Sequence, residues 1–473
     1  MTAPVIVWFR NDLRLDDNPA LDAAARAGAP VVALYALDDE SAGDWRMGAA
    51  SRWWLHYSLT SLSADLARLG VTLILRRGRA DFALEELIGE TGASGVYWNR
   101  LYEPWAIRRD SEIKARLRAR GLAAESFNGS LLFEPAHLRN KQGDVFKVFS
   151  PFWRACLATG GPPAPLPAPK KLKAAPAQKS EALDDWRLLP TKPDWAKVMR
   201  ETWKAGEKAA RKRLADFAAG PVNDYKVARD FMATAGVSRM SPHLHFGELS
   251  PRRVWTEIMA AAGEDGLPYL REIGWREFCH HLLVANPEMP DRALDQRFNE
   301  FPWVYETAQL EAWQKGRTGY PLVDAAMREL WLTGYMHNRA RMVAASFLVK
   351  HLLLPWQEGE RWFWDTLVDA DLANNSGGWQ WVAGCGADAA PYFRVFNPVL
   401  QGEKFDPEGD YVRRYVPELG KLEARWIHRP WEAPDDVLRK AGVTLGETYP
   451  PPIVDHAQAR ARALAAFEAI KGT

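Results

Sequence analysis

The sequence predicts two unlike domains: an N-terminal α/β domain built on a doubly wound parallel sheet, and a C-terminal domain that is all-helical. Three observations predict this division. Over residues 1–130, short apolar runs rich in β-branched residues alternate with amphipathic segments, which is typical of parallel strands with helices on both faces of the sheet. A long connector rich in Pro, Ala and Lys occupies residues 131–194. Strand signals are rare in residues 195–473.

Four strands are expected in the first domain. They are the runs PVIVWFR, PVVALYAL, VTLILRRG and GVYWNR. The first run is followed by NDLRLDDNPAL, which places Asn18 as a helix N-cap and Pro19 as the first helical residue. A nucleotide can bind at the strand ends of such a sheet. The chain has no GxGxxG or phosphate-loop pattern, however, so we favour a structural turn at this position.

The connector contains GGPPAPLPAPKKLKAAPAQKS, whose composition favours an extended interdomain linker. After it, segments such as YPLVDAAMRELWLTGYMHNRARMVAASFLVKHLLL carry apolar residues at helical spacing and are interrupted by Gly and Pro. This pattern predicts the helices of the second domain.

Composition and charge exclude several classes of protein. No apolar run reaches the ~20 residues that a membrane helix requires, and the first residues lack the features of a secretory signal, so we expect a cytoplasmic protein. The three cysteines, Cys156, Cys279 and Cys385, are far apart and have no metal-ligand spacing, which argues against a disulfide framework or a zinc site. The formal net charge of +1 means that nucleic-acid binding would need a local basic surface.

Polar side chains at helical spacing indicate a pocket in the second domain. Asn338, Arg341 and Met342 occupy positions i, i+3 and i+4, which puts an amide, a guanidinium and a thioether on one helix face. Glu272 and Trp275 are three residues apart, and a carboxylate beside an indole can bind the edge of a flat ligand. A solvated helix face is the alternative interpretation of both groups.

The stretch GVSRMSPHLHFGELSP offers Ser238, Arg239 and Ser241 in a turn-rich segment that suits a pyrophosphate. Capping of a helix by Ser241 is a second interpretation, and it is compatible with the first. His243 and His245 have no third ligand at useful spacing, so we expect no metal.

The chain shows no nucleophile, base and orienting residue that stand out as a set, which hydrolytic chemistry requires. It carries instead 22 tryptophans. Flat rings and amides suit one-electron chemistry on a bound flavin, in which the cofactor supplies the reactivity and the protein positions it.

Several motifs together resemble the DNA photolyase and cryptochrome family over nearly the whole chain. They are VIVWFRNDLRLDDNPAL, GVSRMSPHLHFGELS, WREF, TGYMHNRARM, WQEGERWFWDTLVDADLANNSGGWQW and DAAPYFRVFNP. The resemblance implies an α/β antenna domain, a connector and an all-helical domain that holds FAD.

The resemblance also implies which residues bind FAD. Asp369, Asp371 and Arg341 match residues around the isoalloxazine, and Asn375 matches the residue that faces flavin nitrogen N5. Asn at this position resembles photolyases, whereas plant cryptochromes carry Asp. The usual Thr of the phosphate segment is Val237 here, so one hydroxyl contact is lost. The residues that match the phosphate and ribitol segment are Tyr225, Ser238, Arg239, Met240 and Ser241.

Five residues match the lesion pocket of photolyases for cyclobutane pyrimidine dimers. Photolyases for the (6-4) lesion carry His where Asn338 and Met342 stand here, so the resemblance favours the cyclobutane dimer. The family's frequent Trp before the MHNR run is Tyr335. The five residues are Glu272, Trp275, Asn338, Met342 and Trp381.

Two further groups follow from the resemblance. Trp379, Trp356 and Trp303 match the tryptophan chain that carries electrons from the protein surface to oxidised flavin. The positions near DNA phosphates are matched by Arg229, Arg339 and Arg394.

The second chromophore is implied less directly. The folate contacts of many bacterial photolyases are absent, since Trp45, Trp105 and Ala106 replace them. The stretches GAASRWWLHYSL and YWNRLYEPWA resemble plant cryptochromes and the related class III photolyases, some of which bind the same folate differently. We expect methenyltetrahydrofolate, with a deazaflavin or FMN as the alternative. The candidate antenna residues are Glu40, Trp45, Arg46 and Asn99.

The resemblance thus implies a monomeric enzyme that repairs UV-damaged DNA with light. A blue-light photoreceptor of the cryptochrome type is an alternative, against which the chain ends at ARARALAAFEAIKGT without a long tail. A (6-4) photolyase is another. A light-independent flavin redox enzyme would need a nicotinamide fingerprint, which the sequence lacks.

Overall fold

The computed structural model describes residues 2–389 and 393–471, so part of the motif DAAPYFRVFNP lies outside the described residues. Two compact units are present. Unit 1 consists of Met1–Asn223, Ser238–Pro287 and Val368–Ala373, and unit 2 consists of Asp224–Val237, Glu288–Leu367 and Asn374–Thr473. The domain boundaries at residues 130 and 194 remain a prediction.

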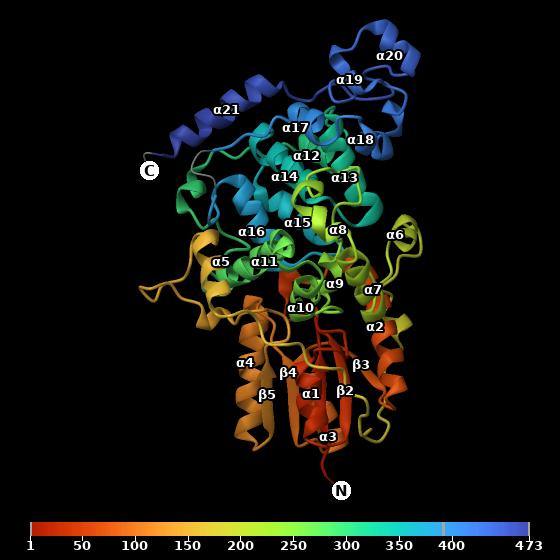
Figure 1. Cartoon of the computed structure of the whole chain (residues 1–473), viewed down its shortest axis with the longest axis vertical. Coiled ribbons are helices and arrows are strands. Elements are labelled where there is room, and N and C mark those ends of the chain that lie inside the picture. Colours follow the sequence, from red (N-terminus) through yellow and green to blue (C-terminus); the bar gives the residue numbers. More distant parts are fainter. Residues whose placement is uncertain (1, 390–392, 472–473) are drawn as a thin grey trace. The chain divides into compact units, whose positions relative to one another are not determined.

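Unit 1 contains a five-stranded sheet with the order β3-β2-β1-β4-β5 (Figure 1). All neighbouring strands run parallel, and Val5 of β1 lies opposite Val31 on one side and Gly95 on the other. This confirms the predicted parallel sheet. The strands are β1 (Val5–Phe9), β2 (Val31–Leu37), β3 (Leu73–Arg77), β4 (Gly95–Asn99) and β5 (Ala123–Phe127).

Strand β5 was not expected from the sequence. Its residues, AAESF, lack a β-branched side chain, and only Ala124 is buried. The strand lies at the edge of the sheet and pairs only with β4 among the described strands. An edge strand buries little apolar surface, so its sequence shows little of the pattern by which strands are recognised.

One face of the sheet is buried by helices α3 and α4. Alternate strand residues, such as Ile6, Trp8 and Val96, form one apolar cluster with Leu84 of α3 and Leu117 of α4. Period-2 alternation places these strand side chains on the same face. The helices of unit 1 are α1 (Pro19–Arg26), α2 (Ala49–Arg68), α3 (Ala80–Thr91), α4 (Pro104–Ala119), α5 (Phe149–Ala158), α6 (Lys197–Thr202), α7 (Glu207–Ala218), α9 (Ser241–His245), α10 (Pro251–Ala262) and α11 (Leu267–Ala285).

The predicted connector, residues 131–194, is free of helix only in its proline-rich part, residues 160–180, which contains an isolated bridge. Elsewhere the range contains α5 (Phe149–Ala158) and short 3-10 turns at Pro135–His137 and Leu183–Trp186, so the prediction of an extended connector was wrong there. Helix α5 buries Phe149, Phe152, Trp153 and Cys156, which recur at helical spacing.

The proline-rich part follows the surface of the sheet domain. The amide of Val31 donates to the carbonyl of Lys173 at 2.7 Å, and the amide of Leu166 donates to the Asp17 carboxylate at 2.9 Å.

Unit 2 is helical. Its described residues contain one isolated bridge, between Leu445 and Tyr449, and no strand. None of the described helices in either unit is long and apolar enough to cross a membrane. The helices of unit 2 are α12 (Thr307–Gln314), α13 (Pro321–Thr333), α14 (Asn338–Ser346), α15 (Trp356–Thr366), α17 (Pro398–Phe405), α18 (Asp410–Tyr415), α19 (Ala424–Ile427), α20 (Asp435–Ala441) and α21 (His456–Ala469), and two further helices, α8 (Pro221–Ala228) and α16 (Leu372–Ala383), each include a boundary between the units.

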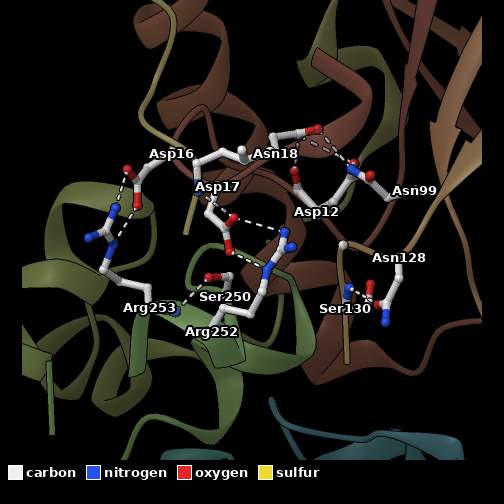
Figure 2. Close-up of polar contacts among 12 residues, drawn as sticks. Asp12, Asp16, Asp17, Asn18, Asn99, Asn128, Ser130, Ser250, Arg252 and Arg253 are labelled. Atoms are coloured by element: carbon white, nitrogen blue, oxygen red, sulfur yellow. Dashed lines mark hydrogen bonds and ion pairs between the residues drawn. The ribbon is translucent and has the colours of Figure 1, made fainter. Parts of the chain in front are cut away.

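The loop after β1 is a structural turn, as predicted. Asn18 caps α1 by accepting a hydrogen bond from the amide of Leu21 at 3.1 Å, and Pro19 is the first helical residue. Figure 2 shows how this loop is tied to α10: Asp16 forms two hydrogen bonds with Arg253, at 2.8 and 2.9 Å, and Asp17 pairs with Arg252. These pairs hold α10, and with it the preceding residues 238–250, against the sheet domain.

Candidate active site

Residues 238–241 of unit 1 form a strained turn at the start of α9. Arg239 has a φ of +53°, which a residue with a side chain adopts at a cost of about 1–2 kcal/mol. Two contacts hold the turn. The Arg239 guanidinium lies 4.9 Å from the ring centre of Trp203, and the Ser238 hydroxyl donates to the Tyr269 hydroxyl at 3.2 Å.

Ser241 does not cap the helix, so that interpretation was wrong. The N-cap of α9 is the buried Met240, which makes no side-chain cap. The Ser241 hydroxyl instead donates to Oδ2 of Asp369 at 2.5 Å. Its hydroxyl therefore belongs to a polar group made with a segment 128 residues away, and local sequence patterns carry no information on such a pair.

This turn has the chemistry of an anion site. It presents a guanidinium from Arg239, hydroxyls from Ser238 and Ser241, and the buried carboxylate of Asp369. A guanidinium and hydroxyls can bind phosphate oxygens, and a carboxylate can accept hydrogen bonds from ligand hydroxyls. The residues present therefore fit a phosphorylated ligand that also carries sugar or alcohol groups.

A buried glutamate that the sequence analysis missed holds α9 in place. Glu248 accepts hydrogen bonds from the Trp54 indole at 3.0 Å and from the Gly206 amide at 2.7 Å, and its other oxygen contacts Nδ1 of His243. The side chains of Trp54, His243 and Glu248 are fully buried. His243 is thus part of a structural network, and the described residues contain no group of three side chains able to hold a metal.

Asp371 lies in a second polar group of unit 1. Its Oδ2 is 3.4 Å from Nε2 of His280 and 4.0 Å from Nδ1 of His245. Burial opposes ionisation of Asp371, but the charge of His280 and contacts with both histidines outweigh burial and hold the pKa of the carboxyl well below its usual value. Asp371 is therefore a carboxylate.

Glu272 and Trp275 lie on α11, three residues apart as predicted. Both side chains are partly exposed. The Trp275 ring stacks on Phe149 of α5, with ring centres 3.8 Å apart and an angle of 8° between the planes. Stacking fixes the plane of the indole, so α11 presents a carboxylate beside a rigid flat surface.

In unit 2, α14 brings Asn338 and Met342 into contact, which confirms the predicted spacing. The Asn338 amide lies 3.9 Å from the Met342 sulfur. Asn338 is exposed at the first turn of the helix, so its amide is accessible to a ligand. Arg341 donates to the carbonyl of Met336 at 2.7 Å and lies over the ring of Tyr335.

The backbone of α15 fixes the orientation of Asn375. Nδ2 of Asn375 donates to the Glu360 carbonyl at 3.0 Å. A carbonyl only accepts, so the amide nitrogen must point to Glu360, and Oδ1 is the atom that remains to accept a hydrogen bond from a ligand N–H.

Glu360 itself was missed by the sequence analysis. It is buried, and its carboxyl accepts a hydrogen bond from Ser376 at 2.5 Å. Burial raises the pKa of Glu360 well above its usual value and so favours the protonated carboxyl. A signal was present: Trp356, Glu360 and Phe363 share one face at i, i+4 and i+7, which places an acidic residue on an apolar helix face.

Trp379 and Trp356 are buried and Trp303 is partly exposed, all within unit 2. Trp379 packs directly on Gly359 of α15, and its indole N–H has no hydrogen-bond acceptor among the described residues. Trp303 and Trp356 line a cavity of about 340 Å³. Trp381 is fixed by a hydrogen bond from its indole to the carbonyl of Asp388 at 3.1 Å.

The three predicted DNA-contacting arginines of unit 2 lie over aromatic rings. Arg229 is 5.3 Å from the ring centre of Tyr225, which is buried. Arg339 pairs with Asp230 at 2.5 Å and lies over Phe405, and the exposed Arg394 lies over Phe396. Stacking limits the motion of a guanidinium without neutralising its charge.

The candidate antenna residues do not form one group. Glu40 and Arg46 are exposed and Trp45 is partly exposed, all in the loop between β2 and α2. Asn99 is buried at the end of β4, where its amide donates to Asp12 at 2.6 Å and to Asn18 at 2.8 Å (Figure 2). Both N–H groups of Asn99 therefore serve the turn after β1.

Comparison with known proteins points to one family. The family model described as "FAD binding domain of DNA photolyase" matches residues 269–469, and the one described as "DNA photolyase" matches residues 5–170. The chain is 53% identical to the "Deoxyribodipyrimidine photo-lyase" of Agrobacterium fabrum, over 100% of this chain and 99% of the relative. It is 43% identical to "Cryptochrome-1" of Arabidopsis thaliana, over 97% of this chain and 69% of the relative. The crystal structure of a bacterial class III photolyase from Agrobacterium tumefaciens matches with a TM-score of 0.97 and 52% identity, and covers 100% of this chain and 98% of that one.

Proposed function

Since the chain belongs to the DNA photolyase and cryptochrome family, we propose that it binds FAD and repairs cyclobutane pyrimidine dimers in DNA with blue light. The observation that carries this proposal is its full-length similarity to a deoxyribodipyrimidine photo-lyase, at 53% identity. The accessible amide of Asn338 beside the Met342 thioether supports the same substrate, because it offers a hydrogen-bond donor and an apolar contact to a pyrimidine pair.

The residues of the turn and their partners fit FAD. The Arg239 guanidinium supplies donors suited to its phosphates, and Asp369 supplies an acceptor suited to its hydroxyls. The Ser238 and Ser241 hydroxyls would donate to the phosphates after turning away from Tyr269 and Asp369. The Oδ1 atom of Asn375 can accept from the N5–H of reduced isoalloxazine, because Nδ2 is engaged by Glu360. We assign Tyr225, Met240, Arg341 and Asp371 to the same cofactor.

When bound, reduced and excited by light, FAD supplies one electron to the dimer. As is general for photolyases, the lesion is taken out of the base stack. Asn338, and Glu272 with its carboxyl protonated, would hydrogen-bond the dimer carbonyls and stabilise the added negative charge as the two bonds joining the rings break. The electron would then return from the separated pyrimidines to the cofactor, so repair causes no net oxidation or reduction. Fixed donors of this kind are most effective where water is excluded. Trp275, Met342 and Trp381 provide apolar walls for the rings.

Trp303, Trp356 and Trp379 are proposed to pass electrons inward for cofactor reduction. Two of these indoles are buried, and the third is partly exposed and lies on the same cavity wall as Trp356. Arg229, Arg339 and Arg394 are proposed to contact DNA phosphates, because the rings beneath them restrict the motion of their guanidinium groups. Arg339 also pairs with Asp230, so a phosphate would compete with that carboxylate for its guanidinium.

We also propose a second, light-harvesting chromophore in unit 1, methenyltetrahydrofolate or alternatively a deazaflavin or FMN. Glu40, Trp45 and Arg46 are accessible and combine an aromatic ring with both charges, which suits a flat ligand with an acidic tail. Asn99 would contribute by fixing the adjacent turn. The fluorescence spectrum of the released chromophore distinguishes a folate from a deazaflavin and from FMN.

Repair of a defined substrate tests the function. Photoreduced protein is mixed with an oligonucleotide that holds one thymine dimer, and the return of thymine absorbance under blue light is compared with a dark control. Light-dependent return is expected. Absence of return from protein with reducible FAD would contradict dimer repair, and the same assay on a (6-4) oligonucleotide would then test that lesion.

A blue-light photoreceptor is the second candidate, favoured by 43% identity to a plant cryptochrome. It predicts FAD photoreduction without repair of either lesion. Sedimentation at several concentrations tests the further proposal that the protein acts as a monomer, and fractionation of cells tests its proposed cytoplasmic location.

A further inference from the structure

Two adjacent histidines on α11 of unit 1 have opposite surroundings. His280 is buried; its Nδ1 lies 2.9 Å from the carbonyl of Arg276, and its Nε2 lies 3.4 Å from the carboxylate of Asp371. His281 is also buried, but its Nε2 lies 3.2 Å from the backbone amide of Phe146. The two partners of His280 accept hydrogen bonds, whereas the partner of His281 donates one, and this difference decides how many protons each ring carries.

The contacts of His280 require two protons on its ring. A carbonyl oxygen only accepts hydrogen bonds, so Nδ1 must carry a proton to bond the Arg276 carbonyl. Nε2 faces the Asp371 carboxylate. Without a proton, the lone pair of Nε2 would point at a lone pair of the carboxylate oxygen, and the two would repel each other. With protons at both nitrogens, the ring is an imidazolium that donates in one direction and pairs with Asp371 in the other.

The contacts of His281 require the opposite. A backbone N–H only donates, so Nε2 of His281 must be the bare, accepting nitrogen. Burial, aided by the charge of Arg139, lowers the pKa of His281 to about 4. His281 is therefore neutral at physiological pH, which makes it a control one residue from His280.

The other charged groups near His280 already have partners. Arg276 donates to the carbonyl of Ser130 at 2.8 Å and lies 3.6 Å from Glu277. The Tyr102 ring is perpendicular to the imidazole, with 6.2 Å between ring centres, and the Tyr102 hydroxyl donates to Glu134 at 3.0 Å. Glu134 also pairs with Arg100 at 2.8 Å. His245 lies 4.0 Å from the same Asp371 oxygen that faces His280.

The acid–base behaviour of the pair agrees with this geometry. Burial alone would lower the pKa of His280, but the charge of Asp371 and the hydrogen bonds to it and to the Arg276 carbonyl outweigh burial and raise the pKa above its ordinary 6.5. The contribution of the pair to stability is therefore complete below pH 6.5 and is lost as the pH rises through the folded-state pKa.

We propose that His280 is a positioning residue that stays protonated, holds Asp371 in place as a carboxylate and offsets its charge beside the cofactor. This inference rests on the proposed function, in which Asp371 binds FAD, and on the family resemblance, which matches Asp371 to a residue around the isoalloxazine. Reduced isoalloxazine carries negative charge, and an unbalanced carboxylate next to it opposes reduction. The imidazolium removes that opposition and so favours the reduced cofactor on which repair depends.

The charge of His280 is tested first, without any use of the enzyme's activity. Protein labelled with ¹⁵N in histidine is titrated between pH 5 and pH 9, and His280→Gln and His281→Gln assign the two imidazole signals. The His280 signal should stay in the doubly protonated form above pH 6.5, and that of His281 should show a neutral ring throughout. A His280 ring that is neutral at pH 6 would overturn the proposal.

The effect on the cofactor is tested by spectroelectrochemical titration of bound FAD. His280→Gln should lower the equilibrium constant for reduction at least about tenfold, the usual size of a neighbouring charge effect, which is about 59 mV for a one-electron step. His281→Gln should leave the potential unchanged. Equal potentials in wild type and His280→Gln would refute the tuning role. Wild-type protein that binds no FAD would refute the proposed function and the tuning role together, whereas the imidazole spectrum decides the charge of His280 in every case.

Discussion

Substitution of Gly359 by alanine should displace Trp379 and slow light-driven reduction of the cofactor. A Cβ atom built on Gly359 lies 2.0 Å from the nearest carbon of the Trp379 ring and 2.5 Å from two others. Ordinary van der Waals contact begins at about 3.4 Å, so ring and helix must separate by about 1.4 Å. The ring is packed against Phe363 and Trp313, with centres 4.9 and 6.1 Å away, and has little room to move.

The net effect on stability follows from two opposing terms. Alanine is favoured over glycine in a helix by about 1 kcal/mol. Overpacking a well-filled core costs about 1–3 kcal/mol, so Gly359→Ala should lower the free energy of unfolding by about 0–2 kcal/mol. Gly378, in α16, is exposed and its added Cβ meets nothing within 4 Å. Gly378→Ala should therefore gain the higher helix propensity of alanine without any overpacking, and so stabilise the protein.

Both variants are compared with the wild type by urea unfolding and by the rate at which oxidised FAD is reduced under blue light with an external reductant. Gly359→Ala should be the less stable variant by about 1–3 kcal/mol, the overpacking term alone. It should also be reduced more slowly, while Gly378→Ala is reduced at the wild-type rate. Equal stability of the two variants would refute the packing argument. A wild-type reduction rate in a destabilised Gly359→Ala would refute the role of Trp379.

Three further predictions concern the substrate, the DNA and pH. Glu272→Gln keeps an N–H donor and should repair thymine dimers faster than Glu272→Ala; equal repair rates would rule out the hydrogen-bonding role. Arg339→Ala should weaken binding to damaged DNA of any sequence and reduce the salt dependence of binding by about one phosphate contact, measured by fluorescence anisotropy at several salt concentrations; an unchanged slope would contradict the contact. Burial lowers the pKa of Lys350 from 10.5 to about 7, so the folded protein has released a proton that the unfolded chain retains between these values, and stability should rise with pH over that range relative to Lys350→Met in urea unfolding. A stability difference that does not change with pH would show that Lys350 is not buried as a titrating amine.

The features that the sequence predicted correctly are local ones. The Asn18 cap, the first four strands, the helix-free proline-rich stretch at residues 160–180 and the contact between Asn338 and Met342 depend on residues at most a few positions apart. The regular geometry of helices and strands means that such spacings decide which side chains lie on the same face. The family motifs extended this to the cofactor and the reaction, because their order along the chain is itself a sequence property.

Tertiary structure decided the features that depend on distant residues or on burial. Asp16 and Arg253 are 237 positions apart, and Ser241 meets Asp369 across 128 positions, so no local pattern reveals either pair. Strand β5 exists because β4 offers it a partner, although its own sequence has a weak signal. The raised pKa of Glu360 and the charge of the His280 ring depend on what surrounds each group, because burial and a neighbouring charge can move a pKa away from the usual value of the side chain. The sequence by itself therefore determined the kinds of groups available for the site, and the folded chain determined their charge and orientation.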